Sequence, residues 1–223
     1  MGRWQPNAME RLQQAAWALF LERGYVEVTV AEIAEKAGLT KRSFFNHFAD
    51  KREVLFAQAP AFEAGVIQHL AEADKALDPI DAAVSALTLG GLDLASYGNS
   101  AQTRRELIAS SLELQERNLI KTASLAAAIA VELHGRHVPG RIPTFAAEAA
   151  VAVFSAAYDQ WADDTTADFP TLMQQSLSDL RHAITTPQRV AAAGTAAPPT
   201  GCDSSAGGGR RRPASTSRRR LMP

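Results

Sequence analysis

Side chains suited to binding phosphates and base edges gather between residues 36 and 52. Over this stretch only one carboxylate, Asp50, opposes five cationic residues, which are Lys36, Lys41, Arg42, Lys51 and Arg52. Lysine and arginine neutralise DNA phosphates, and an arginine guanidinium can bond guanine O6 and N7 together. The hydroxyl groups of Ser43 and Thr29 add donors for phosphate oxygens. This cluster therefore indicates a surface that contacts nucleic acid.

Two short helices joined by a tight turn are expected to position these side chains. Thr29 can cap the first helix, and Glu32 stands at the spacing that completes a capping box. Gly38 suits the left-handed residue that ends such a helix, and Thr40 can cap the second. Apolar residues at helical spacing would hold both helices to a core: Ile33, Ala34, Ala37, Phe44 and Phe48. The pattern predicts a helix-turn-helix whose second helix enters the major groove.

The segment from about Leu12 to Phe56 resembles the DNA-binding domain of the tetracycline-repressor (TetR) family of bacterial regulators. The matching residues are Ala15, Ala16, Leu19, Phe20, Gly24, Tyr25, Thr29, Ile33, Ala34, Ala37, Gly38, Phe44, His47, Phe48, Lys51 and Leu55. The resemblance implies a homodimer in which each subunit presents one recognition helix to a half-site of a pseudo-palindromic operator. It also implies that the last two long helices of each subunit pair across the dimer in a four-helix bundle.

The resemblance further assigns residues to the DNA surface. By analogy, these positions face DNA: Lys41, Arg42, Ser43, Phe45, Asn46, His47 and Lys51. Arg42 is the best candidate for base readout, whereas Lys41 could read a guanine or bind a phosphate. Lys51 is expected to contact a phosphate. Thr29 and Ser43 could donate to phosphates or serve only in capping and local bonding.

The distribution of charge separates three parts of the chain. Residues 1–56 carry eight Lys/Arg and seven Asp/Glu, residues 57–187 carry eight and sixteen, and residues 188–223 carry seven and one. An acidic body with a cationic patch near one end would dock on DNA through that end. The arginine-rich tail cannot bury enough apolar surface to order itself, so it is expected to be disordered.

The body between residues 57 and 187 is expected to be helical throughout. Helices are predicted at about 80–97, 102–112, 116–133, 144–163 and 169–184. A fourth helix is expected to open at Asp50, and Pro60 is expected to kink or briefly break it. A kink would make that helix a jointed lever, whereas a helix that ends near Gln58 and restarts at Ala61 would have no mechanical role. Gly90 and Gly91 are expected to bend their helix.

The helix from Thr144 to Trp161 is apolar nearly all round, which requires burial on two sides. One side carries Ala147, Val151, Phe154, Tyr158 and Trp161, and the other carries Phe145, Ala149 and Val153. The first side can pack on its own domain. The second side needs a partner, most simply the same helix of a second subunit.

Four polar or aromatic residues fall on otherwise apolar helices of the body: His69, Tyr97, Tyr158 and Trp161. Such groups could bind a small, largely apolar effector, or they could be core residues with one satisfied polar tip. We expect no cofactor and no metal, because His134 and His137 sit at a helix end before a Gly/Pro loop. No nucleophile elbow, phosphate-binding glycine loop or carboxylate pair indicates an enzyme.

These observations predict an all-α protein in three parts. Residues 1–56 form a helix-turn-helix DNA-binding domain, residues 57–187 form a helical effector-binding and dimerisation domain, and residues 188–223 form the disordered tail. The predicted function is a ligand-responsive transcriptional repressor that acts in the cytoplasm without a membrane partner. Two alternatives stay open. One is an architectural, non-specific DNA binder that uses the basic tail, and the other is a helical ligand-binding protein or enzyme with a vestigial DNA motif.

Overall fold

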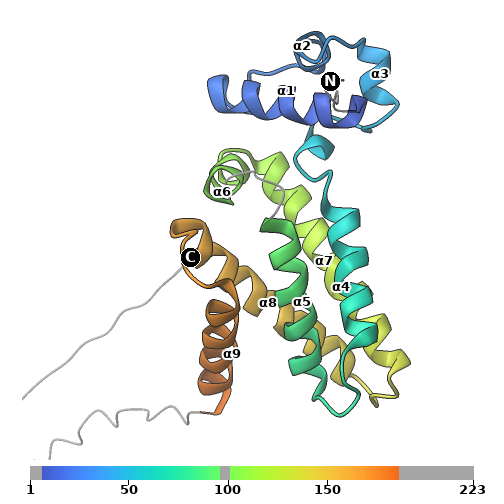
Figure 1. Cartoon of the computed structure of the whole chain (residues 1–223), viewed down its shortest axis with the longest axis vertical. Coiled ribbons are helices and arrows are strands. Elements are labelled where there is room, and N and C mark those ends of the chain that lie inside the picture. The colour runs from blue at the N-terminus through green and yellow to red at the C-terminus, as the bar shows by residue number, and fades with distance from the viewer. Residues whose placement is uncertain (1–6, 96–100, 186–223) are drawn as a thin grey trace, which may run out of the picture. The chain divides into compact units, whose positions relative to one another are not determined.

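The structure is a computed structural model of the chain and describes residues 7–95 and 101–185. Within these residues every regular element is helical, which confirms the predicted all-α class (Figure 1). The elements follow in the order α1 (Ala8–Arg23), α2 (Val30–Lys36), α3 (Lys41–Phe45), the 3-10 helix η1 (Arg52–Val54), α4 (Ala59–Glu72), α5 (Pro79–Ala95), α6 (Ala101–Ala109), α7 (Leu112–Gly135), α8 (Ile142–Asp163) and α9 (Phe169–Thr185). Tyr97 and the predicted tail lie outside the described residues.

Side-chain caps fix the ends of the first three helices. Thr29 caps α2 and forms the expected capping box with Glu32, and Thr40 accepts a bond from the backbone N–H of Ser43 at the start of α3. Gly38 has a φ of 64°, the left-handed conformation that turns the chain between α2 and α3. A shared core of buried residues then holds the three helices together, and it includes Leu12, Ala16, Phe20, Ile33, Phe44 and Phe48.

The segment after α3 differs from the prediction. A continuous fourth helix from Asp50 was expected, but a short 3-10 helix spans Arg52–Val54 and α4 begins only at Ala59. Asp50 accepts bonds from the backbone N–H groups of Arg52 and Glu53, so it caps the 3-10 turn instead. Pro60 falls in the first turn of α4. The predicted kink is therefore wrong, because a first-turn proline displaces no helical hydrogen bond, and the alternative of a break near Gln58 is what the structure has.

A proline in the first turn of a helix affects stability differently from a proline in the helix interior. Proline at a compatible backbone position stabilises a fold, mainly by restricting the unfolded chain. We expect Pro60→Ala to lower the free energy of unfolding by about 0.4–1 kcal/mol, where an interior proline would instead give a gain. Urea denaturation of both proteins measures this. A clear stabilisation by Pro60→Ala would contradict the assignment of Pro60 to a helix start.

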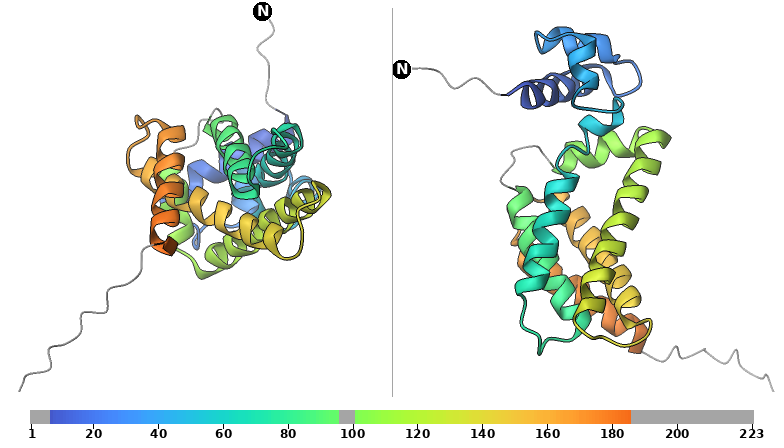
Figure 2. Two further views of the ribbon diagram at one scale, coloured as in Figure 1. Left: turned by 90° about the horizontal axis from the view of Figure 1, so that it is seen from below. Right: turned by 90° about the vertical axis from the view of Figure 1, so that its right-hand side faces the viewer.

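The helices from α4 to α9 build a second core. Figure 2 shows α4 beside α5 and α7 beside α8, and α9 packs on α8 and α5. Helix α5 runs without a break through Gly90 and Gly91. A Cβ atom on Gly91 would collide with the Phe169 ring, and one on Gly90 would lie 2.7 Å from Val66. These glycines therefore permit close approach of neighbouring helices, and the bend stays a prediction.

The apolar residues of α8 face the predicted sides except at Val153. Ala147, Val151 and their neighbours face the core of the same protomer, as expected. Val153 is also buried there, at 3% exposure, so its assignment to the partner side is wrong. Phe145 keeps 66% of its surface exposed and Ile142 keeps 50%. The face of α8 that lacks a partner within the protomer therefore centres on Phe145 rather than on Val153.

Candidate DNA-binding face and ligand cavity

Helix α3 offers a short polar surface anchored from behind by buried aromatic rings. Phe44 is fully buried, and Phe48 lies 5.4 Å from it, centroid to centroid. Lys41 and Arg42 occupy the first turn of α3 and are exposed. Neither side chain forms an ion pair with a described residue. Two cations on a rigid helix start are therefore free to meet phosphates or base edges.

The remaining predicted residues of this surface are also accessible. Asn46 and His47 are exposed, and Phe45 is 49% exposed with its ring edge against Phe44. Ser43 is half-buried, and its hydroxyl lies 2.9 Å from the Thr40 hydroxyl. An exposed phenyl ring beside polar groups suits contact with a thymine methyl group.

Thr29 is engaged within the protein. Its hydroxyl donates to the Glu32 carboxylate at 2.7 Å and accepts from the Glu32 backbone N–H at 3.3 Å. Arg23 also donates to Glu32, at 2.7 Å. The Thr29 hydroxyl, the Arg23 guanidinium and the Thr29 backbone N–H together lower the pKa of Glu32 to about 2. The geometry gives Thr29 a capping role, and a phosphate contact stays a prediction.

Lys51 is turned toward the protein's own backbone. Its Nζ donates to the carbonyl of Tyr25 at 2.7 Å and to that of Val28 at 2.8 Å, and it lies 4.0 Å from the centroid of the Tyr25 ring. Burial lowers the pKa of Lys51, while Glu113, Glu27 and Glu32 oppose that shift. In this position the ammonium ties the loop between α1 and α2 to the segment after α3. Its predicted phosphate contact is not tested by this geometry.

We therefore expect Lys51→Ala to lower stability as well as DNA affinity. Removing the ammonium leaves two partly buried carbonyls without donors, which costs about 1–3 kcal/mol of unfolding free energy. Thermal denaturation measures this, with exposed Lys36→Ala as the matched control that loses a charge but no such bond. If Lys51→Ala melts like Lys36→Ala, the structural role of Lys51 is contradicted.

Charged contacts connect the DNA-binding helices to α7. The Glu53 carboxylate of η1 accepts a hydrogen bond from Arg117 and forms an ion pair with Lys121 at 3.3 Å. Burial acts to raise the pKa of Glu53, but these two cations hold it below its ordinary value. The Tyr25 hydroxyl donates to Glu113 at 3.2 Å, and burial followed by this carboxylate raises the pKa of Tyr25. These contacts link α7 directly to residues of the helix-turn-helix domain.

A cavity of about 780 Å³ lies where these helices meet. Its lining comes from α1, with Gln13 and Trp17, from Leu55 and Phe56, and from α4 to α8. An aromatic cluster forms much of the wall: Phe62, Phe154, Tyr158 and Trp161, with neighbouring ring centroids no more than 6.0 Å apart. Sites for small molecules have this size and this mainly apolar character.

The four residues predicted for ligand binding are not all at this cavity. Tyr158 and Trp161 line it. His69 lies elsewhere, with its Nε2 3.2 Å from an oxygen of Asp93, and it does not line the cavity. Tyr97 falls outside the described residues. Within the part of the chain that the structure describes, no cluster of three or more His, Cys, Asp or Glu could hold a metal ion, and no helix is long and apolar enough to cross a membrane.

Sequence reasoning missed the cationic residues of the cavity. Arg104 and Lys121 both line it, on α6 and α7. The sequence did contain one signal for Arg104. It stands three residues after Ala101 and three before Leu107, which places it on the apolar side of α6, the side expected to face the core. Ala101 and Leu107 are both buried.

Two family models match this chain. Residues 12–57 match the model described as bacterial regulatory proteins, tetR family, and residues 94–185 match the MftR C-terminal domain. Together the two matches cover most of α1, then α2 to η1, and α6 to α9. The chain belongs to the TetR family of bacterial transcriptional regulators. The first match contains every residue predicted to face DNA, and the second contains Arg104 and Lys121.

Curated relatives of known type agree with this family. The putative mycofactocin biosynthesis transcriptional regulator MftR of Mycobacterium tuberculosis is 25% identical over 174 residues, covering 74% of this chain and 84% of the relative. The regulator TcmR of Streptomyces glaucescens is 34% identical over 73 residues, covering 33% of this chain. The chain spans about a third of the length of TcmR and about a quarter of that of the TetC protein of Escherichia coli.

Solved TetR structures share the fold. The complex of SmeT with triclosan has a TM-score of 0.55 at 20% identity, covering 87% of this chain and 99% of SmeT. A putative TetR-family regulator from Syntrophomonas wolfei has a TM-score of 0.56 at 15% identity, covering 82% of this chain and 97% of that protein. At these identities the likeness concerns the fold alone.

Proposed function

We propose that this TetR-family protein is a ligand-responsive repressor that binds a pseudo-palindromic operator as a homodimer in the cytoplasm. The observation that carries the proposal is the surface of α3. Lys41 and Arg42 are exposed and have no ion-pair partner among the described residues, while Phe44 fixes the helix to the core behind them. A rigid helix with free cations and polar side chains is what major-groove readout requires.

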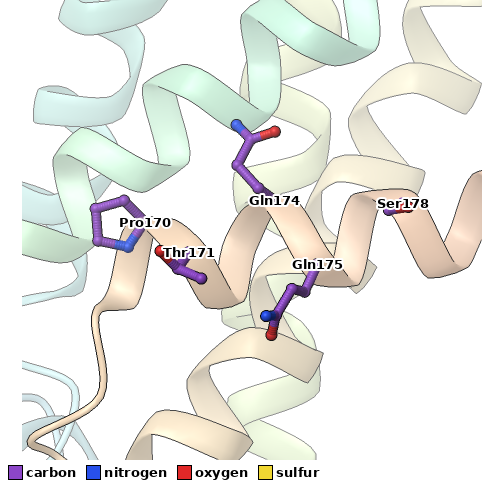
Figure 3. A pocket seen from close by; sticks show the side chains of 5 residues that line it. All are labelled: Pro170, Thr171, Gln174, Gln175 and Ser178. Atoms are coloured by element: carbon purple, nitrogen blue, oxygen red, sulfur yellow. The ribbon is translucent and has the colours of Figure 1, made fainter.

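The dimer is supported by the surfaces of α8 and α9. The exposed side of α8 carries Ile142 and Phe145 and continues through Ala152 and Ala156, small residues that allow a second helix to approach closely. On α9, a shallow groove is lined by Pro170, Thr171, Gln174, Gln175 and Ser178 (Figure 3). Most of these side chains are apolar or uncharged, with the exposed carboxylates of Glu148 and Asp179 beside them, and the exposed apolar residues among them are the kind that a helix of a second subunit could cover.

An effector is supported by the cavity. Trp17 and Phe56 belong to the core of the DNA-binding helices, whereas Phe154 and Trp161 pack on the core of the body, and all four line the same space. A molecule bound there would contact both groups of helices. It would release DNA if it bound more tightly to an arrangement whose recognition helices are wrongly spaced. SmeT has been solved with triclosan bound, so one member of this fold is known with a small molecule.

Recovery of bound fragments from sheared genomic DNA tests the proposal. The purified protein is mixed with fragments at physiological salt, and the retained fragments are sequenced. We expect them to share a motif with two inverted half-sites about one helical turn apart. Retention of fragments without a common motif would contradict sequence-specific binding and would favour an architectural role instead.

A further inference from the structure

Arg104 differs from the other cations around the cavity because the described residues give it no carboxylate partner. Arg105 forms an ion pair with Asp163, and Lys121 forms one with Glu53. Arg104 instead interacts with the Tyr158 hydroxyl, and its guanidinium carbon lies 5.3 Å from the centroid of the Phe56 ring. The side chain is only partly exposed, and it lines the cavity.

The Arg104 guanidinium has lost part of its hydration, and its partners among the described residues are a hydroxyl group and a ring rather than an anion. Burial lowers the pKa of Arg104, and the Tyr158 hydroxyl offsets only part of that shift. An arginine nevertheless stays protonated in proteins, so the charge persists inside the fold. Buried charges are ordinarily paired, since an unpaired one has lost its hydration without compensation. The cavity therefore holds a positive charge that an incoming anion could neutralise.

Part of the cavity wall suits an apolar body attached to that anion, while amide and hydroxyl groups and the carboxylates of Glu63 and Asp159 line other parts. Phe62, Leu125, Val151, Phe154 and Trp161 supply aromatic and aliphatic surface. Gly91 lets the Phe154 and Phe169 rings pack directly against the backbone of α5. An effector that fills this space would have one charged end and a hydrophobic remainder.

We propose that the effector is an amphipathic organic anion whose acidic head group binds the Arg104 guanidinium while its apolar part packs against the aromatic wall. This inference rests on the proposed function and names the class of ligand that the regulator senses. A carboxylate and a phosphate ester share the chemistry, because both accept two parallel hydrogen bonds from one guanidinium. The bound anion also competes with the Phe56 ring for Arg104. Since Phe56 belongs to the core of the DNA-binding helices, the occupied cavity changes a contact of that domain.

Intrinsic fluorescence measures binding directly, since Trp17 and Trp161 line the cavity. The probes are decanoate and decyl phosphate, with 1-decanol as the neutral control of the same chain length. For the wild type we expect at least one of the two anions to bind ten or more times more tightly than the alcohol. The head group that gives this preference identifies the source as carboxylate or phosphate. Equal affinity for the anions and the alcohol, or no binding of either anion, would overturn the proposal.

Substitutions test whether Arg104 is the residue that causes the preference for an anion over the alcohol. Arg104→Gln is expected to bind the preferred anion at least tenfold more weakly while binding 1-decanol as before. Arg105→Gln is the matched control, because it removes a neighbouring arginine that already has an acidic partner. Circular dichroism monitors folding, and the comparison of probes on the wild type stands even if Arg104→Gln does not fold. An unchanged anion affinity in folded Arg104→Gln would refute the role of Arg104.

These titrations contain no DNA, so they separate the ligand class from the regulatory role. Release of an operator by the preferred anion is measured afterwards. Anion binding through Arg104 without any operator release would uphold the ligand class and would count against the ligand-responsive repressor.

Discussion

Phe145→Glu is expected to convert the dimer to monomers and to weaken operator binding by a factor on the order of 10²–10⁴. Phe145 is 66% exposed in the protomer, so a carboxylate there leaves the isolated fold intact. In the proposed dimer the same carboxylate would be buried in an apolar seam without a partner, which costs several kcal/mol. In a dimer, binding of one recognition helix raises the effective concentration of the second helix at its half-site, and a monomer lacks this gain.

Light scattering and operator titration on the same samples measure both effects. Leu77→Glu is the matched control, since it places the same charge on another exposed apolar residue, 42% exposed, in the loop between α4 and α5. Two results would count against the α8 surface as the interface. One is a Phe145→Glu protein that remains dimeric, and the other is a wild type that is monomeric at working concentration yet binds its operator tightly.

Arg42→Ala is expected to cost about 1–3 kcal/mol at the operator and to relax the preference at one base position in each half-site. Arg42 lies in the first turn of α3 and is exposed, so its loss removes a contact with DNA rather than part of the core. Binding to non-specific duplexes should weaken much less, because one phosphate-neutralising charge among several has been lost.

The comparison with Arg42→Lys separates base readout from charge. A lysine keeps the positive charge but lacks the planar fork that bonds guanine O6 and N7 together. We therefore expect Arg42→Lys to retain non-specific affinity and still lose base preference. Selection of bound sequences from a randomised half-site measures both quantities. If both variants kept the wild-type preference at every position, Arg42 would not be the residue that reads bases.

The helix-turn-helix could be predicted closely because its determinants are local. The caps at Thr29 and Thr40 act over three residues, and the turn at Gly38 depends on one backbone conformation. Phe44 and Phe48 are one helical turn apart, so their burial follows from spacing alone. Each of these features can be recognised in a short window of sequence.

Features that depend on contacts between distant segments could not be predicted from a short window of sequence. The Lys51 ammonium meets carbonyl groups 23 and 26 residues earlier in the chain, and no spacing rule connects them. The burial of Val153 depends on which side of α8 the neighbouring helices cover. Pro60 fits a helix start as well as a helix interior by composition, and only the 3-10 turn at Arg52–Val54 decides between them.

For the cavity, too, some residues could be predicted from the local sequence and others could not. The aromatic residues Tyr158 and Trp161 were recognisable as unusual positions on an apolar helix. His69 had the same appearance, yet its ring lies beside Asp93 and away from the cavity. Arg104 was overlooked because a charged residue on a short helix ordinarily faces solvent. Among the described residues, Arg105 and Lys121 each have a carboxylate partner and Arg104 has none, which is why we propose Arg104 as the anion-binding residue.

The ratio of affinities for the operator and for a scrambled duplex of equal length tests the central claim most directly. The operator is the motif recovered from genomic fragments, and both titrations are made at one physiological salt concentration. Sequence-specific regulators bind their sites roughly 10³-fold or more tightly than other DNA. We predict a ratio of at least that order for the wild type, and a ratio near one would contradict the assignment of α3 as a recognition helix.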